Sequence, residues 1–227
     1  MLSIIEIYRS IQGESSFAGL PCTFVRLAGC NLRCTWCDSE YTFSGGKKMS
    51  KDDIAAEVQK LSPAGLVEIT GGEPMLQERE LMPLMQQLLD RGYQILVETS
   101  GERPLAGVPK AVHKIVDVKC PDSGEGETFH LENLDALTKN DEVKFVIASR
   151  RDYDFARNFT RVHSLDTKVN AVIFSPAFRK DATGSRDASH CLIDPREIAD
   201  AIVADQLNVR LGLQIHKFVW DPATKGV

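Results

Sequence analysis

Three cysteines lie within one short segment, CNLRCTWC, at Cys30, Cys34 and Cys37. Three thiolates on one loop can hold a metal centre and leave a coordination position open. A structural zinc site normally has four ligands in two separated pairs, and an iron–sulfur cluster normally takes four cysteines. The spacing alone leaves a structural metal site, a cluster with one open iron and a coincidence as alternatives.

The other three cysteines, Cys22, Cys120 and Cys191, are isolated, and we expect Cys22 and Cys191 to be small core residues. Six cysteines in 227 residues do not form a disulfide scaffold, which favours a cytoplasmic protein with reduced thiols. A net charge of −5 lacks the basic character of a nucleic-acid binder. No uncharged apolar stretch reaches the roughly 18 residues of a membrane span. We therefore expect neither a nucleic acid nor a membrane as partner.

Short apolar, β-branched runs alternate with helical patterns, which predicts βαβ units and a mostly parallel sheet in a single domain over residues 1–227. The predicted strands are Ile4–Tyr8, Thr23–Leu27, Leu66–Ile69, Gln94–Glu98, Lys114–Val118, Glu142–Ile147, Val169–Phe174 and Val209–Ile215. The predicted helices are one capped by Ser50 with Ile54, Val58 and Leu61 on one face, one with Leu81, Leu84, Met85, Leu88 and Leu89 that ends near Gly92, one marked by Phe155, Phe159 and Val162, and one opened by Asp194 and Pro195.

Polar residues gather where the predicted strands end. The cysteine segment follows one strand, and Thr70-Gly71-Gly72-Glu73-Pro74 follows the next. Further strand ends carry Glu98, Asp117, Lys119, Ser175, Pro176, His216 and Lys217. In parallel α/β barrels the carboxyl ends of the strands form the rim at which chemistry is done. The sequence therefore predicts an enzyme.

The motif CxxxCxxC, followed in the next βα unit by TGGEP, resembles the radical S-adenosylmethionine (SAM) superfamily. Within it, the chain resembles the 7-carboxy-7-deazaguanine synthase family over nearly its whole length, through IQGE at Ile11–Glu14, Arg26 in FVRLAGCNLRC, CDS at Cys37–Ser39, DVKCP at Asp117–Pro121 and QIHKFVW at Gln214–Trp220. Members of that family are lyases that convert 6-carboxy-5,6,7,8-tetrahydropterin to 7-carboxy-7-deazaguanine and ammonia, a step in queuosine biosynthesis. The resemblance implies an incomplete parallel β/α barrel, and the sparse helical pattern between Gly101 and Lys119 agrees with it.

The resemblance also implies the cofactors. Cys30, Cys34 and Cys37 would hold a [4Fe–4S] cluster whose open iron binds SAM, and Ser39 would bind Mg²⁺. Glycines at Gly71 and Gly72 would let the backbone approach the methionyl group of SAM. The residues implied to bind SAM are Trp36, Cys37, Asp38, Gly71, Gly72, Glu98, Asp117, Val118, Lys119, Ser175, Pro176, Ala177 and Phe178.

For the substrate, the resemblance implies a pocket formed by Ile11, Gln12, Gly13, Glu14, Arg26, Thr70 and His216. Arg26 would pair with the substrate carboxylate. Its position in a strand agrees with this role, because strand interiors seldom carry an unpaired charge. Glu14 would accept hydrogen bonds from the pyrimidine edge. A flavodoxin- or ferredoxin-type electron donor and a homodimer are implied as well. Some family members end at the position of Pro222, whereas this chain continues with Ala223–Val227.

Two alternative functions remain. One is a radical SAM activase that generates a glycyl radical on a partner protein, although IQGE, Arg26 and QIHKFVW argue against it because a protein substrate needs no carboxylate and pterin pocket. The other is a zinc-stabilised binding module without catalysis. Metal content after anaerobic purification separates a radical SAM enzyme from a zinc-stabilised module, because a cluster gives a brown protein with about four irons.

Overall fold

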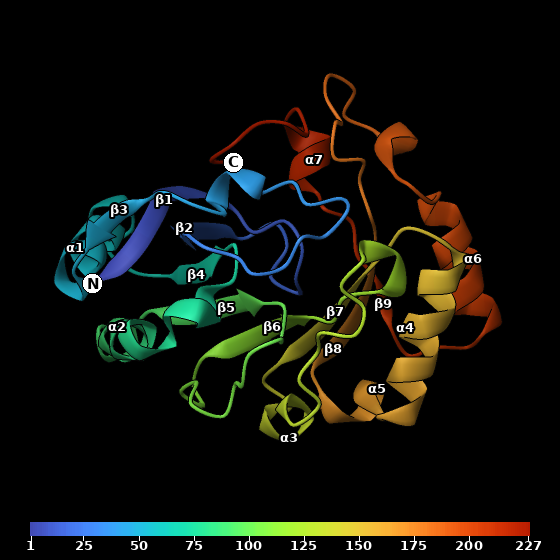
Figure 1. The fold of residues 1–227 in the computed structure, drawn as a ribbon, viewed down its shortest axis with the longest axis horizontal. Helices are drawn as coiled ribbons and strands as arrows, with labels where there is room; N and C mark the ends of the chain where they lie inside the picture. Colours follow the sequence, from blue (N-terminus) through green and yellow to red (C-terminus); the bar gives the residue numbers. More distant parts are fainter.

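The computed structural model describes residues 1–227 and contains one nine-stranded sheet with the order β3-β1-β2-β4-β5-β6-β7-β8-β9 (Figure 1). Neighbouring strands from β2 to β9 pair in parallel, whereas β1 pairs antiparallel with both β2 and β3. The bounds are β1 (Leu2–Ile11), β2 (Pro21–Leu27), β3 (Lys47–Met49), β4 (Leu66–Gly71), β5 (Gln94–Thr99), β6 (His113–Asp117), β7 (Glu142–Ile147), β8 (Ala171–Pro176) and β9 (Arg210–Leu211). Because β3 and β9 are edge strands, the mostly parallel sheet stays open, and the predicted incomplete barrel is confirmed.

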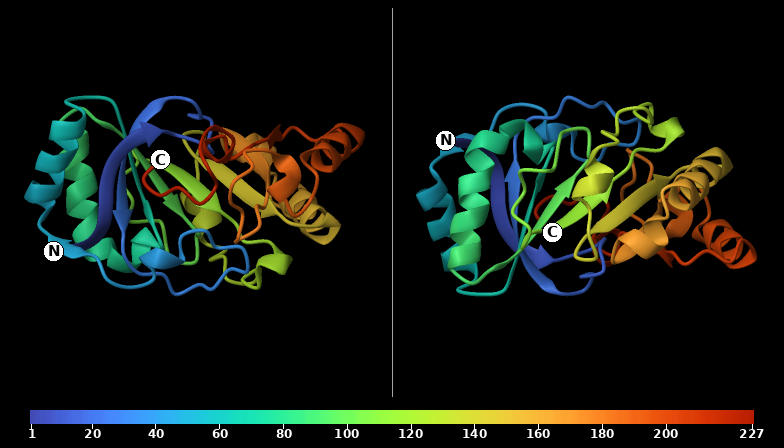
Figure 2. Two further views of the ribbon diagram at one scale, coloured as in Figure 1. Left: turned by 90° about the horizontal axis from the view of Figure 1, so that it is seen from above. Right: turned by 90° about the horizontal axis from the view of Figure 1, so that it is seen from below.

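Helices cover the outer face of the sheet, with α1 and α2 over one end and α4 and α6 over the other (Figure 2). The α-helices are α1 (Lys51–Leu61), α2 (Glu78–Asp90), α3 (Asn133–Ala136), α4 (Arg150–Val162), α5 (Leu165–Lys168), α6 (Pro195–Ala204) and α7 (His216–Val219), and the 3₁₀ helices are η1 (Glu40–Thr42), η2 (Pro74–Gln77), η3 (Pro121–Ser123) and η4 (Ala188–His190). No helix lies between β5 and β6, where the sequence showed little helical pattern.

The four long helices begin and end where their sequence signals lie. Ser50 caps α1 in a capping box with Asp53, and Asp194 caps α6 ahead of Pro195. Gly92 follows α2 with φ of 84°, a left-handed conformation that favours glycine. The apolar faces of these helices pack into one core against the sheet. In α4, however, Val162 is 76% exposed and lies outside the buried face.

Two differences from the sequence prediction affect the site. The strand expected over Val209–Ile215 is only Arg210–Leu211, and His216 begins α7 instead of ending a strand. The chain bends at Gly212 because it passes close over β8, where a Cβ atom would lie 2.5 Å from Ile173 Cγ2. The other difference is β3, an exposed, lysine-rich segment that forms a strand only by pairing with β1.

Because β1 runs antiparallel to β2, its carboxyl end lies at the end of the sheet where the parallel strands begin. Ile11, the last residue of β1, pairs with Pro21, the first residue of β2. The loop after β1 then crosses beneath the amino ends of β6 and β7. There the Ser16 N–H donates to Glu142 Oε2 at 3.1 Å, and the Phe17 ring packs edge-on against His113 at 4.9 Å. The site can therefore take residues from both ends of the sheet.

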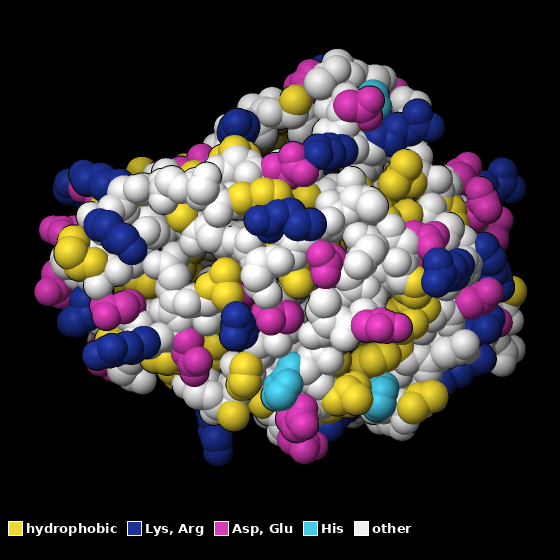
Figure 3. All heavy atoms as spheres, in the orientation of Figure 1, with side chains coloured by type: hydrophobic (Ala, Val, Ile, Leu, Met, Phe, Trp, Pro, Cys, Tyr) yellow, Lys and Arg dark blue, Asp and Glu magenta, His cyan; other side chains and the backbone are white.

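Positive and negative side chains are interspersed on the face of the molecule shown in Figure 3. This distribution agrees with the slightly acidic composition and shows no basic patch on that face. None of the helices combines the length and the apolar character that crossing a membrane requires.

Candidate active site

A cavity of about 380 Å³ lies between the loop after β1, the strand ends of the sheet and the C-terminal segment. Most of the predicted site residues line it, namely Ile11, Gln12, Gly13, Glu14, Arg26, Cys30, Cys34, Trp36, Cys37, Asp38, Ser39, Thr70, Gly71, Gly72, Glu98, Asp117, Lys119, Phe178 and His216. The predicted SAM residues that do not line it are Val118, Ser175, Pro176 and Ala177, which are buried in or beside strands β6 and β8. The sheet thus brings together residues that are more than 180 positions apart in the sequence, such as Cys30 and His216.

The three clustered cysteines are free, half-buried thiols in the loop that follows β2. Cys22 and Cys191 are buried and do not line the cavity, which confirms their expected place in the core. Burial raises the pKa of all three clustered thiols, that of Cys34 to about 11. A metal centre that binds them must therefore displace their protons, as metal binding to cysteine does in general.

The cysteine loop is held in place by the segment that follows β6. Thr35 donates through its N–H to Ser123 O at 3.0 Å and through its hydroxyl to Asp122 O at 2.9 Å. The Arg33 N–H donates to Glu125 Oε1 at 2.6 Å. No set of three or more His, Cys, Asp and Glu side chains is arranged around a single metal ion. Three free thiols along one cavity wall fit a larger group that binds each cysteine through a different metal atom, as an iron–sulfur cluster does.

The glycines of TGGEP are required by the backbone of the cysteine loop. A Cβ atom at Gly71 would lie 2.3 Å from Leu27 O, and one at Gly72 would lie 2.3 Å from Gly29 O. The two glycines that the sequence assigned to SAM binding thus admit the start of the cysteine loop. Glu73 fixes this turn by accepting hydrogen bonds from the hydroxyls of Thr99 and Ser100, both at 2.7 Å. The two motifs thus form one packed unit.

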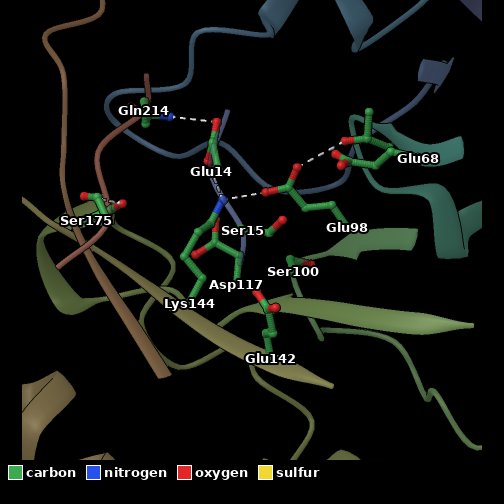
Figure 4. Close-up of polar contacts among 12 residues, drawn as sticks. Glu14, Ser15, Glu68, Glu98, Ser100, Asp117, Glu142, Lys144, Ser175 and Gln214 are labelled. Carbon is green, nitrogen blue, oxygen red and sulfur yellow. Dashed lines mark hydrogen bonds and ion pairs between the residues drawn. The ribbon is translucent and has the colours of Figure 1, made fainter. Parts of the chain in front are cut away.

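A buried charged group forms the other side of the cavity, and we call Glu14, Glu98, Asp117 and Lys144 the Lys144 cluster (Figure 4). The Lys144 ammonium donates to Glu14 Oε2 at 2.6 Å and to Glu98, and Asp117 Oδ2 lies 3.8 Å away. The amide of Gln214 donates to Glu14 Oε1 at 2.9 Å. The sequence placed Glu98 with the SAM residues, whereas this contact puts it beside Glu14, a predicted substrate residue.

The charges of the Lys144 cluster depend on one another. Burial alone would raise the pKa of Glu14, but attraction to Lys144, His216 and Lys217 outweighs burial and lowers it to about 2. Burial would lower the pKa of Lys144, but Glu14, Glu98 and Asp117 hold it well above its usual value. Glu14 and Lys144 are therefore both charged near neutral pH.

Lys144 and Glu68 were not identified from the sequence, although a signal was present. Each is a charged residue inside an apolar strand, in EVKFVI and LVEIT, the same signal that drew attention to Arg26. Glu68 is 1% exposed and accepts a hydrogen bond from Gln12 Nε2 at 3.0 Å. Burial, followed by repulsion from Glu98, raises its pKa to about 8.

We expect Glu68 to make stability depend on pH. A carboxyl group with a raised pKa binds more protons in the folded state, so stability falls as the pH rises from the ordinary carboxyl range to about 8. Glu68→Gln keeps a neutral side chain at every pH. Its Tm minus that of the wild type should therefore increase between about pH 5 and pH 8 and stay constant above that range.

Thermal unfolding followed by circular dichroism at several pH values measures this difference. The exposed Glu127 provides the control, because Glu127→Gln removes a carboxylate that has no hydrogen-bond partner. A Tm difference for Glu68→Gln that does not change with pH would contradict the raised pKa.

Arg26 is paired within the protein. Its Nε donates to Glu6 Oε1 at 2.8 Å, and its Nη2 donates to the Tyr8 hydroxyl at 2.7 Å. The Tyr41 hydroxyl also donates to Glu6 Oε1, at 2.7 Å. These contacts leave Nη1 of Arg26 without a partner and fix the guanidinium at the cavity wall.

Ser39 and Asp38 lie between the cysteine loop and α7. The Ser39 hydroxyl donates to Asp38 Oδ1 at 2.8 Å, and Lys217 Nζ donates to Asp38 Oδ2 at 2.6 Å. His216 Nε2 lies 4.0 Å from Glu14 Oε1, and burial lowers the pKa of His216, so its imidazole is neutral near neutral pH. A Cβ atom at Gly13 would lie 2.3 Å from His216 Nδ1, which explains why a glycine precedes Glu14.

The C-terminal segment Pro222–Val227 also lines the cavity. Lys225 Nζ lies 4.3 Å from the centre of the Tyr41 ring, in a cation–π contact. The residues beyond Pro222 therefore pack next to the Glu6–Arg26–Tyr41 contacts.

The fold and the cysteine loop define the class of protein. A family model described as "Radical SAM superfamily" matches residues 25–173. The fold is similar to a crystal structure of QueE from Escherichia coli, with a TM-score of 0.72 and 24% identity over 93% of each chain. It is also similar to SuiB from Streptococcus suis, with a TM-score of 0.56 and 12% identity over 81% of this chain and 46% of that chain. The protein is a radical SAM enzyme, a class that uses a [4Fe–4S] cluster and SAM.

Curated relatives identify the particular family. A 7-carboxy-7-deazaguanine synthase of Koribacter versatilis is 70% identical over 100% of both chains, and one of Chlorobaculum tepidum is 41% identical over 100% of this chain and 97% of its own. The chain therefore belongs to the 7-carboxy-7-deazaguanine synthase family. The predicted lyase activity and its place in queuosine biosynthesis are confirmed, and the glycyl-radical activase and the zinc-stabilised module gain no support.

Proposed function

We propose that the enzyme converts 6-carboxy-5,6,7,8-tetrahydropterin to 7-carboxy-7-deazaguanine and ammonia in this cavity, with Mg²⁺ as a further cofactor. The observation that supports this substrate is the pairing of opposite features in one cavity. Arg26 offers a fixed guanidinium for a carboxylate, while Glu14 and Glu98 offer acceptors for the amino and N–H donors of a pyrimidine edge. The cysteine loop lines the same cavity.

Cys30, Cys34 and Cys37 would hold the cluster, which together with SAM would supply a 5′-deoxyadenosyl radical for hydrogen abstraction from the substrate. The protein itself supplies position and exclusion of water. Two of the proposed SAM residues, Asp117 and Lys119, lie at the end of β6 and line the same cavity as the cysteine loop. Lys119 Nζ donates to Asp117 Oδ2 at 2.7 Å, which holds the two side chains together. Gly71, Gly72, Trp36, Asp38 and Phe178 line the cavity and complete the proposed SAM pocket, whereas Ser175, Pro176 and Ala177 are buried outside its lining.

The substrate residues act by fixed charge. Glu6 and Tyr8 orient the Arg26 guanidinium, so little conformational entropy is lost when it pairs with the substrate carboxylate. Glu14 is ionised because Lys144 stabilises its carboxylate, and it can accept two ring donors without first losing a proton. Gln12, Gly13, Thr70 and His216 line the same part of the cavity, and we propose that they contact the substrate.

We propose Ser39 as the protein ligand of Mg²⁺, completed by water and the substrate carboxylate. Mg²⁺ prefers oxygen ligands and usually keeps several waters, so one hydroxyl can serve once substrate supplies a second ligand. Asp38 lies beside it, and attraction to Lys217 outweighs its burial and lowers the pKa of that carboxyl, which keeps it negative.

An anaerobic assay with SAM, a one-electron reductant and the carboxytetrahydropterin tests this proposal. We expect the wild type to release 7-carboxy-7-deazaguanine and ammonia in equal amounts and to respond to added Mg²⁺. Ser39→Ala should lose most of the Mg²⁺ response, because it removes the only protein oxygen proposed as ligand, while its iron content stays at the wild-type level.

Thr42→Ser is a matched control, since Thr42 lies next to Ser39 but uses its hydroxyl on Ser39 O at 2.7 Å. Unchanged Mg²⁺ dependence in Ser39→Ala would reject Ser39 as ligand. Absence of product from the iron-loaded wild type would reject the substrate.

The remaining proposals concern partners and organisation. The cysteines are only half-buried, which supports electron delivery by a docked flavodoxin- or ferredoxin-type protein. The continuous sheet from β1 to β9 supports a single domain over residues 1–227. The proposed homodimer rests on the family resemblance alone, and light scattering of the purified enzyme tests it.

A further inference from the structure

Lys144 is a buried ammonium that is only partly satisfied by the protein. Its side chain is 3% exposed, yet it lines the cavity from the middle of β7. An ammonium has three N–H donors. Two of them reach Glu14 and Glu98, and the nearest further acceptor, Asp117 Oδ2, lies at 3.8 Å, beyond hydrogen-bond distance. One donor of Lys144 is therefore left for a molecule in the cavity.

The neighbours of Lys144 define what that molecule must present. The Lys144 ammonium contacts both Glu14 and Glu98, so one donor and two carboxylate acceptors lie together at the cavity (Figure 4). A ligand that pairs with all three needs two N–H donors and a carbonyl acceptor on one edge. The 2-amino-4-oxo edge of a reduced pterin carries an amino group, a ring N–H and a carbonyl oxygen in that order.

We infer that Lys144 determines specificity by donating a hydrogen bond to the ring carbonyl oxygen of the substrate, while Glu14 and Glu98 accept from its amino and ring N–H groups. This inference rests on the proposed substrate. It gives the buried Lys144 a role in addition to its pairing with Glu14 and Glu98. A buried donor left unpaired costs free energy, so the site selects against an edge that has an amino group in place of the carbonyl.

The product 7-carboxy-7-deazaguanine carries the same amino, N–H and carbonyl edge and is a stable probe. Its 2,6-diamino counterpart replaces the carbonyl with an amino donor. Titration calorimetry of the cluster-loaded enzyme with SAM should show that the wild type binds the oxo compound about 10- to 150-fold more tightly than the diamino compound, since hydrogen bonds to charged groups contribute about 1.5–3 kcal/mol. In Lys144→Met this preference should fall to about fivefold or less.

Lys114→Met is the matched control. Lys114 is equally buried, at 4% exposure, and pairs with Asp141 at 2.9 Å, but it does not line the cavity. Its replacement should lower stability and leave the preference for the oxo compound at the wild-type value. The ratio of the two affinities separates recognition from general damage, because loss of folded protein affects the titrations of both compounds alike.

A wild-type preference below about fivefold would overturn the inference even if Lys144→Met does not fold, and so would a wild-type preference retained in Lys144→Met. Turnover of the carboxytetrahydropterin by the wild type is measured in parallel. Turnover without the preference rejects the role of Lys144 alone, whereas the preference without turnover rejects the proposed substrate and leaves Lys144 as the reader of a carbonyl edge.

Discussion

Replacing Cys30, Cys34 or Cys37 with alanine should abolish both iron binding and product formation. The three thiols are the only cysteines that line the cavity, and the other three cysteines are buried outside it. A cluster that loses one of three protein ligands leaves two of its irons open and is expected to disassemble. Iron and sulfide analysis after anaerobic reconstitution, together with the product assay, measures the result.

The chain contains its own controls for this experiment. Cys22, Cys120 and Cys191 are buried free thiols outside the cavity, so their replacement by alanine removes a sulfur atom without touching a ligand. Each of these variants should keep an iron content near the wild type, with a modest loss of stability from the small cavity. Iron loss from Cys120→Ala or Cys191→Ala equal to that from Cys34→Ala would indicate a fourth protein ligand, and SAM would then have no open iron.

Local sequence signals located the parallel part of the sheet and the four long helices. The caps at Ser50 and Asp194 and the glycine after α2 act on residues that are close to them in the sequence, through local hydrogen bonds and φ values. Such local interactions can be predicted from the sequence alone. β3 and the short β9 depend instead on a partner strand. The residues of β3 carry no apolar alternation, and in the alternating run Val209–Ile215 only the part that pairs with β8, Arg210–Leu211, becomes a strand.

The site was predictable where a motif marked it and less so where only burial did. The cysteine loop, TGGEP and Arg26 were identified because their residues are unusual for their positions. Lys144 was missed because its partners, Glu14 and Glu98, come from segments 130 and 46 residues away. The same long-range packing supplied Glu6 and Tyr8 as partners of Arg26. A charged residue in a strand indicates a pairing, but its partner becomes visible only in the folded chain.

Arg26→Ala should weaken the apparent affinity for substrate by some 30-fold to several thousand-fold. In the proposed complex the substrate carboxylate pairs with Arg26 at the cavity wall. Removing one partner of a buried, hydrogen-bonded charge pair costs about 2–5 kcal/mol, largely because the other charge stays buried without a partner. The KM for the carboxytetrahydropterin in the anaerobic assay measures this loss, and the substrate-independent cleavage of SAM to 5′-deoxyadenosine should persist because it needs only the cluster and SAM.

The contacts of Arg26 within the protein provide the control for a structural role. Glu6→Gln removes the charge that pairs with Arg26 Nε, but Tyr8 still accepts from Nη2, so the guanidinium stays in place. A partly exposed pair of this kind is worth about 1 kcal/mol or less, and we expect at most about a fivefold change in KM. Normal turnover by Arg26→Ala would refute its pairing with the substrate. Loss of 5′-deoxyadenosine formation in Arg26→Ala but not in Glu6→Gln would instead assign Arg26 to SAM binding, and loss in both variants would make the Glu6–Arg26 pair a requirement of the fold.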